Sequence, residues 1–164
     1  MAKVAVIMGS ISDLDVVKPA IDILKQFGVE VDARVISAHR TPNQAHEYAI
    51  NALDNNIEVI ICAAGKAAHL GGVFAAYTPV PVIGLPVKSS TMDGLDSLLS
   101  MVQMPGGIPV ATVAINGGLN AGLLAIQILA IKYPDLMEKL KEYKANLEKK
   151  INDDDEKLQK ELNK

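Results

Sequence analysis

The sequence of 164 residues contains one cysteine, no tryptophan and three histidines, and its net charge is only −3. A single cysteine, Cys62, excludes an internal disulfide, and no cysteine or histidine pair has zinc-site spacing, so we expect no metal. Without an excess of basic residues, nucleic acid is not an expected partner. No apolar run reaches the roughly 20 residues of a membrane span, and no signal peptide is recognisable. We therefore expect a cytoplasmic protein that does not contact membranes.

Apolar residues make up 49% of the chain and are grouped in short runs separated by helical patterns. This order predicts an α/β protein whose central parallel sheet is covered by helices on both faces. We expect one domain, with residues 1–133 forming its α/β body and residues 134–164 a C-terminal helical tail of the same domain. The tail has the stripe of an amphipathic helix, with a break expected at residues 153–155. The predicted strands are residues 3–8, 29–36, 57–63, 80–87 and 109–115.

A loop of small residues, Gly9-Ser10-Ile11-Ser12-Asp13, follows the first predicted strand. Free backbone N–H groups and the helix dipole at such a junction bind anions. The loop lacks the G-x-G-x-x-G pattern of dinucleotide sites and the ending of a P-loop, which favours a monophosphate as the ligand. Alternatively, Ser12 and Asp13 only cap the next helix. We expect Pro19 in the first turn of that helix, where proline is tolerated.

The loop after the second predicted strand, Ser37-Ala38-His39-Arg40-Thr41-Pro42, carries three side chains that can meet a charged ligand. They are a serine hydroxyl, a histidine imidazole, and an arginine guanidinium with a planar set of donors for phosphate or carboxylate. Thr41 is placed to cap a helix predicted over residues 42–55, with Gln44 completing a capping box. The alternative is a well-capped turn with a solvated arginine.

A second histidine, His69, lies in the loop of residues 64–72 after the third predicted strand. Because the carboxyl ends of parallel strands share one edge of a sheet, we expect His69 at the same edge as His39. The tiny residues around it let a flat ligand approach closely. The other interpretation is that His69 only forms hydrogen bonds at a helix start. His46 lies inside a predicted helix and is interpreted as a surface or packing residue.

Four segments, residues 9–13, 37–42, 64–70 and 96–115, together resemble the N5-carboxyaminoimidazole ribonucleotide mutase family, the class I PurE-type enzymes of de novo purine (IMP) synthesis. The resemblance covers about residues 3–132. It implies a flavodoxin-like three-layer sandwich that assembles as a homo-octamer, with active sites at subunit contacts. It also implies an isomerase that moves a carboxyl group from N5 to C4 of the aminoimidazole ribonucleotide without a metal or organic cofactor.

By this resemblance, His39 is the general acid/base of the reaction. Carboxyl migration through carbon dioxide needs a group that moves one proton between nitrogen and carbon, and histidine side chains suit that task near neutral pH. The resemblance implies phosphate and ribose contacts from the loops of residues 9–13 and 37–42. We expect the loop of residues 64–72 to form a wall of the pocket. The expected substrate-binding residues are Ser10, Asp13, Ser37, Arg40, Gly65, Ala67, His69 and Leu70.

The sequence departs from the mutase pattern at Lys66 and Gly71, where many members have glycine and proline, and in a shortened loop at residues 116–120. Lys66 either binds a carboxylate or faces solvent. A second class of the family carboxylates aminoimidazole ribonucleotide directly with carbon dioxide and departs from the His-Arg-Thr-Pro sequence, which this chain retains. We therefore favour the mutase over the direct carboxylase. A non-catalytic nucleotide-phosphate sensor is the alternative of a different class, and it would have little need for His39.

Overall fold

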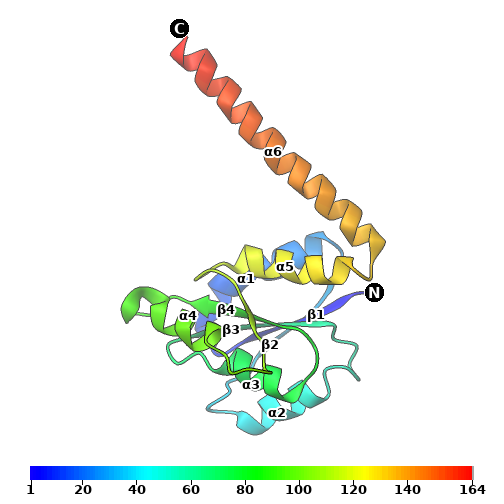
Figure 1. The fold of residues 1–164 in the computed structure, drawn as a ribbon, viewed down its shortest axis with the longest axis vertical. Coiled ribbons are helices and arrows are strands. Elements are labelled where there is room, and N and C mark those ends of the chain that lie inside the picture. Colours follow the sequence, from blue (N-terminus) through cyan, green and yellow to red (C-terminus); the bar gives the residue numbers. More distant parts are fainter. Residues whose placement is uncertain (164) are drawn as a thin grey trace.

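The computed structural model, which describes residues 1–163, contains a five-stranded sheet between two layers of helices (Figure 1). All strand pairs are parallel, and the strand order is β2-β1-β3-β4-β5. This is the order of flavodoxin-like folds, in which ligands bind beyond the carboxyl ends of β1 and β3. The predicted fold class is confirmed. The strands are β1 (Lys3–Met8), β2 (Glu30–Val35), β3 (Val59–Gly65), β4 (Val82–Val87) and β5 (Ala111–Thr112).

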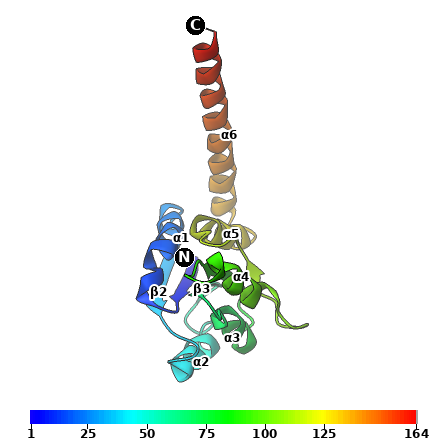
Figure 2. The same cartoon turned by 90° about the vertical axis from the view of Figure 1, so that its left-hand side faces the viewer.

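Helices cover both faces of the sheet, as Figure 2 shows from the side. One face carries α1 (Leu14–Gln26) and α5 (Gly118–Ala130), and the start of α6 (Pro134–Leu162) packs on the same layer. The other face carries α2 (Pro42–Ile50), α3 (Leu70–Tyr77) and α4 (Leu95–Val102). Short 3-10 turns, Ile11–Asp13 and Met92–Gly94, precede α1 and α4. No helix within residues 1–163 combines the length and the apolarity needed to cross a bilayer.

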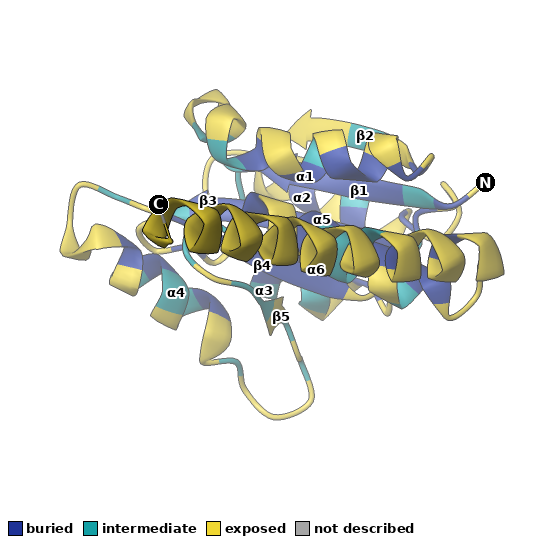
Figure 3. Cartoon of the chain, turned by 90° about the horizontal axis from the view of Figure 1, so that it is seen from above, coloured by how far each residue is buried: buried dark blue, intermediate teal, exposed yellow. Residues whose placement is uncertain are grey.

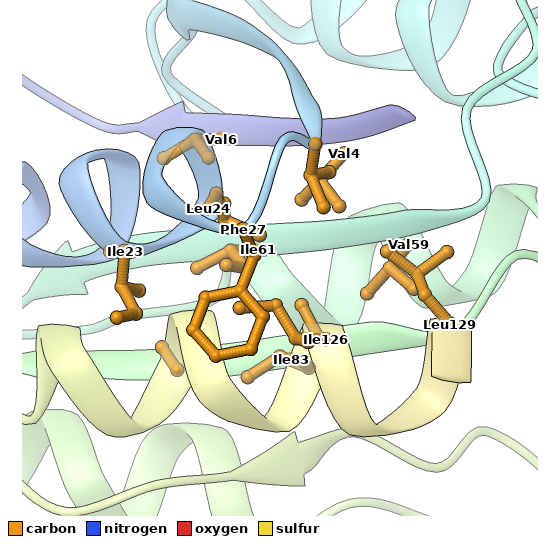
Figure 4. Packing of buried hydrophobic residues seen from close by; sticks show 14 of the residues in the cluster. Val4, Val6, Ile23, Leu24, Phe27, Val59, Ile61, Ile83, Ile126 and Leu129 are labelled. Carbon is orange, nitrogen blue, oxygen red and sulfur yellow. The ribbon is translucent and has the colours of Figure 1, made fainter. Parts of the chain in front are cut away.

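The central strands are buried on both faces, which explains why they read as continuous apolar runs in the sequence. Side chains alternate along β1, so Val4 and Val6 enter the cluster below α1 and α5, whereas Ala5 and Ile7 enter the cluster below α2 and α3. All four are fully buried. Figure 4 shows the first cluster, in which Phe27 at the end of α1 packs between the helices and the sheet.

The α1–α5 contact depends on a close approach at Gly122. A Cβ atom at this position would collide with Ile23 and would lie 3.0 Å from the carbonyl oxygen of Ala20, both in α1. Glycine therefore allows the two helix backbones to pack together.

Several predicted boundaries are wrong. Helix α1 begins at Leu14, so Pro19 lies in its second turn rather than its first. Pro19 is exposed, and the carbonyl that loses its helical partner can be hydrated instead. Helix α2 ends at Ile50, and turns follow to residue 56. Strand β5 has only two residues, Ala111–Thr112. Pro109, at the start of the predicted strand, has no N–H group to donate to a neighbouring strand.

The C-terminal segment is one continuous helix, α6, without the expected break at residues 153–155. One of the three carboxylates there, Asp154, pairs with Lys157 one turn away at 3.1 Å. Only Leu136 and Leu140 of α6 are buried. Tyr143 packs edge-on against Phe27, and beyond it the helix projects from the body of the chain and is exposed (Figures 1 and 3).

Candidate active site

A cleft of about 640 Å³ lies at the carboxyl edge of the sheet, between the loops that follow β1, β2, β3 and β4. It spans the point between β1 and β3 where the strand order reverses, which is the usual ligand site of this topology. The structure brings all nine residues nominated from the sequence to this cleft. They are Ser10, Asp13, Ser37, His39, Arg40, Gly65, Ala67, His69 and Leu70.

The loop after β2 is closed by its own hydrogen bonds. The Thr41 hydroxyl donates to the Ser37 carbonyl oxygen and accepts from the Ser37 backbone N–H, both at 3.0 Å. The Thr41 N–H also donates to the Ser37 carbonyl, at 2.8 Å. The predicted capping box with Gln44 is therefore wrong: the hydroxyl points back to Ser37 and makes no cap bond to α2. These bonds nevertheless hold the loop in place, as the capping box was expected to do.

Arg40 connects the loops after β1 and β2. Its Nη2 donates to the Gly9 carbonyl oxygen at 3.0 Å, and its Nε donates to the Ser37 hydroxyl at 3.3 Å. The Ser37 hydroxyl also accepts the Arg40 backbone N–H at 3.2 Å. A guanidinium has five N–H donors, so these two side-chain bonds leave others for an anion in the cleft. The interpretation of Arg40 as a merely solvated side chain does not fit these contacts.

The loop after β1 is capped by Ser10 rather than by Ser12 or Asp13. The Ser10 hydroxyl accepts from the Ser12 backbone N–H at 3.3 Å and from the Ser12 hydroxyl at 2.9 Å. Asp13 makes no cap bond and lines the cleft. Burial raises the pKa of the Asp13 carboxyl, and a backbone hydrogen bond from Ser10 and the charge of Arg40 offset only part of that rise. The cleft thus holds a carboxyl group close to a guanidinium.

The two histidines of the cleft form a direct pair. The Nε2 atom of His39 lies 3.0 Å from the Nδ1 atom of His69, and the rings are nearly perpendicular, at 87°. A hydrogen bond at this distance requires one of the two nitrogens to carry the hydrogen and the other to accept it. His69 precedes α3 and makes no side-chain cap bond, so its contact is with His39 and not with the helix start.

Sequence reasoning missed the loop after β4, where Lys88 and Ser89 line the cleft. The Lys88 ammonium pairs with Asp93 at 3.1 Å, and the Ser89 hydroxyl donates to the Thr91 carbonyl at 2.6 Å. The rule that placed the other loops at the carboxyl edge of the sheet applies equally to these two residues, which directly follow β4. Lys66 also lines the cleft and has a left-handed backbone, with φ of 56°.

The remaining titratable candidates lie outside the cleft or are inert. The His46 ring stacks edge-on against Tyr77 at a centroid distance of 4.6 Å, which confirms its interpretation as a packing residue. Cys62 is fully buried, and burial raises the pKa of its thiol. Within residues 1–163, no three histidine, cysteine, aspartate or glutamate side chains are grouped to hold a metal ion.

Comparison with known proteins identifies the family. The family model for AIR carboxylase matches residues 3–150. The N5-carboxyaminoimidazole ribonucleotide mutase of Thermotoga maritima is 57% identical over 151 residues, covering 92% of this chain and 88% of that protein. The enzyme of the same name from Pyrococcus abyssi is 59% identical over 149 residues, covering 91% of this chain and 86% of that protein.

The fold is also found in a solved relative. The crystal structure of Treponema denticola PurE superposes with a TM-score of 0.88 at 30% sequence identity, covering 96% of this chain and 99% of that chain. The chain therefore belongs to the AIR carboxylase family.

Proposed function

We propose that this protein is an N5-carboxyaminoimidazole ribonucleotide mutase, an isomerase of purine biosynthesis that moves the substrate's carboxyl group from N5 to C4. The observation that carries the proposal is the His39–His69 pair, 3.0 Å apart, in one cleft with the anchored guanidinium of Arg40. A pair of imidazoles supplies proton transfer, and a guanidinium supplies an anion contact. The mutases of Thermotoga and Pyrococcus, at 57% and 59% identity, support the same reaction.

The chemistry requires one proton to be given and one to be taken. Cleavage of the N5–carboxyl bond releases carbon dioxide and leaves the exocyclic nitrogen in need of a proton. Attack of C4 on the carbon dioxide forms the new carboxylate, and C4 then loses its proton. The two transfers balance, so one group that donates to nitrogen and accepts from carbon is sufficient. We assign that role to His39, with His69 as its hydrogen-bond partner.

The other cleft residues are assigned to binding. Arg40 and Ser37 lie in the loop after β2, and Ser10 follows Gly9, whose carbonyl oxygen accepts from Arg40, so together they suit the phosphate. Asp13 is an acceptor for a ribose hydroxyl, because a carboxylate would repel the phosphate itself. The small wall residues Gly65 and Ala67, with Leu70, allow the flat imidazole ring to lie close to the backbone. Enclosure of the ring there would keep carbon dioxide next to C4.

A parallel assay distinguishes this proposal from a direct carboxylase. Purified protein is supplied either with the N5-carboxylated ribonucleotide or with aminoimidazole ribonucleotide and bicarbonate, and the C4-carboxylated product is measured. We expect fast turnover of the first substrate and slow turnover of the second, even at high bicarbonate. Faster use of the second substrate would assign the protein to direct carboxylation instead.

Substitution of His39 distinguishes an enzyme from a nucleotide-phosphate sensor. His39→Asn should lower kcat by a factor of about 100 to 10,000, since general acid/base catalysis contributes about that much. Binding of the ribonucleotide should persist, because Arg40 and Ser37 remain. The matched control is His46→Asn, which alters a histidine outside the cleft and should leave turnover unchanged. A wild-type protein that binds the ribonucleotide but never turns it over would be a sensor.

We also propose that the chain assembles as a homo-octamer in the cytoplasm, with residues 1–133 as the catalytic unit and residues 134–164 as a helical tail. Light scattering of the full chain tests the octamer. Truncation after Tyr143 tests the tail and retains Leu136 and Leu140, which belong to the core. An active octamer after truncation would show that the projecting part of α6 is dispensable for both assembly and turnover.

A further inference from the structure

Lys66 occupies a backbone conformation that lysine rarely adopts. Its φ of 56° lies in the left-handed region, where side chains with a Cβ are strained and glycine is not. The residue directly follows Gly65, the last residue of β3, and it lines the cleft as an exposed residue. A lysine held in a strained conformation at the edge of a binding cleft indicates a role for the side chain.

The Lys66 ammonium has no carboxylate partner within residues 1–163, whereas the other two cations of the cleft both contact protein oxygen atoms. Lys88 pairs with Asp93 at 3.1 Å, and Arg40 donates to Gly9 and Ser37. The neighbours Gly65 and Ala67 carry no polar side chain that could accept from Lys66. Its positive charge is therefore available to an anion in the cleft.

The position of Lys66 relative to Arg40 suits a ligand with an anionic group at each end. Arg40 follows β2 and reaches back to the end of β1, whereas Lys66 follows β3. Strand β1 separates β2 from β3, so the two loops start about 10 Å apart. The His39–His69 pair bridges the same two loops. The reacting atoms of a bound ligand would thus lie between the guanidinium and the ammonium.

We infer that Lys66 binds the carboxyl group of the substrate and thereby distinguishes carboxylated from uncarboxylated ribonucleotides. This inference rests on the proposed function, which supplies a ligand with a phosphate at one end and a carboxylate on the other. Arg40 holds the phosphate, and Lys66 holds the carboxylate before and after its migration. A single flexible ammonium suits this task, because it can follow a group that moves between neighbouring atoms of the ring.

The test compares two ligands that differ only in the carboxyl group, the C4-carboxylated aminoimidazole ribonucleotide and aminoimidazole ribonucleotide itself. Their dissociation constants are measured by calorimetry for the wild type and for Lys66→Gly, Lys66→Arg and Lys144→Ala. Glycine tolerates the left-handed backbone, so Lys66→Gly removes the charge without adding strain. Lys66→Arg retains the charge. Lys144→Ala removes one exposed positive charge from α6, far along the chain from the cleft loops.

Lys66→Gly should weaken binding of the carboxylated ligand about 10- to 100-fold and change binding of the uncarboxylated one less than about twofold. Lys66→Arg should restore most of the loss, and Lys144→Ala should change neither constant. The melting temperature of Lys66→Gly should not fall, which separates a lost contact from a damaged fold. Equal weakening for both ligands would make Lys66 a phosphate contact, and no weakening would make it a solvated side chain; either result overturns the inference.

The wild-type measurements separate this inference from the function on which it rests. A wild type that interconverts the two carboxylated isomers, combined with an unaffected Lys66→Gly variant, overturns the role of Lys66 alone. A wild type that neither binds nor converts the ribonucleotides overturns the proposed function, and the ligand assignment of Lys66 with it.

Discussion

The Nε2 atom of His39 and the Nδ1 atom of His69 lie 3.0 Å apart, although 30 positions separate the two residues in the chain. The loops after β2 and β3 bring them together across the end of β1. The contact restrains the orientation of the His39 ring and couples the tautomers of the two imidazoles. The pair should behave as one catalytic unit.

This coupling predicts a non-additive pair of substitutions. His69→Ala should lower kcat by about tenfold or more, because His39 loses the partner that orients it. The double variant His39→Asn/His69→Ala should be no slower than His39→Asn alone, since the second change then removes support for a group that is already absent. Steady-state kinetics on the wild type, the two single variants and the double variant completes this double-mutant cycle. Additive losses would mean that His69 acts independently of His39.

The anchored guanidinium predicts that lysine cannot replace Arg40. Arg40→Lys retains the charge but loses the planar donors that contact Gly9 and Ser37 at the same time. KM for the ribonucleotide should rise about tenfold or more, with a smaller change in kcat, because the contact is to a group remote from the reacting atoms. Arg34→Lys, in β2 and outside the cleft, is the matched control and should leave both constants unchanged.

The raised pKa of Asp13 predicts a conflict between stability and binding. The carboxyl binds its proton more tightly in the folded than in the unfolded chain, so its ionisation destabilises the fold as the pH rises from the ordinary pKa through the raised one. Asp13→Asn should therefore raise the melting temperature at pH 7 while weakening ribonucleotide binding. The gain should shrink as the pH falls below the ordinary aspartate pKa of 3.8, because the wild-type carboxyl then binds its proton in both the folded and the unfolded chain. Thermal melts across this range test the prediction, and the exposed Asp54→Asn controls for the loss of one charge.

The close approach of α1 and α5 predicts a sharp difference between two glycines. Gly122→Ala should destabilise the fold by about 1 to 3 kcal/mol, because the added methyl group collides with Ile23 and presses on Ala20. At Gly106 an added Cβ would meet no atom within 4 Å, so Gly106→Ala should change stability by less than about 0.5 kcal/mol. Chemical denaturation of both variants measures the difference. If Gly122→Ala lowered the free energy of unfolding as little as Gly106→Ala does, α1 and α5 could move apart without loss of stability.

The sequence predicted the sheet and the site in different ways. The buried strands could be read from apolar runs such as Lys3–Met8, because full burial on both faces leaves an unbroken signal. The rule that carboxyl ends share one edge then placed His39 and His69 together. The same rule applies to Lys88 and Ser89, but their polar segment contains no histidine or arginine that would indicate a binding site in the sequence.

Other features depend on tertiary contacts that local patterns do not contain. The Thr41 hydroxyl can form hydrogen bonds either with the first turn of α2 or with the backbone of Ser37. Only the folded loop determines which of the two it forms. The position of Pro19 within α1 follows from the buried stripe of that helix, which extends N-terminal to the proline and includes Val17. Helix α6 likewise continues through residues 153–155, where Lys157 pairs with Asp154, and the run of like charges alone does not reveal such a pair.

The hydrogen bonds between Thr41 and Ser37 also affect how fast and how selectively a ligand can bind. All of them run within the loop, so no ligand atom is needed to hold Ser37, His39 and Arg40 in their relative positions. An incoming ribonucleotide therefore loses little affinity to the ordering of this loop. Selection against the wrong ligand must then come from the contacts themselves rather than from a closing motion of the loop after β2.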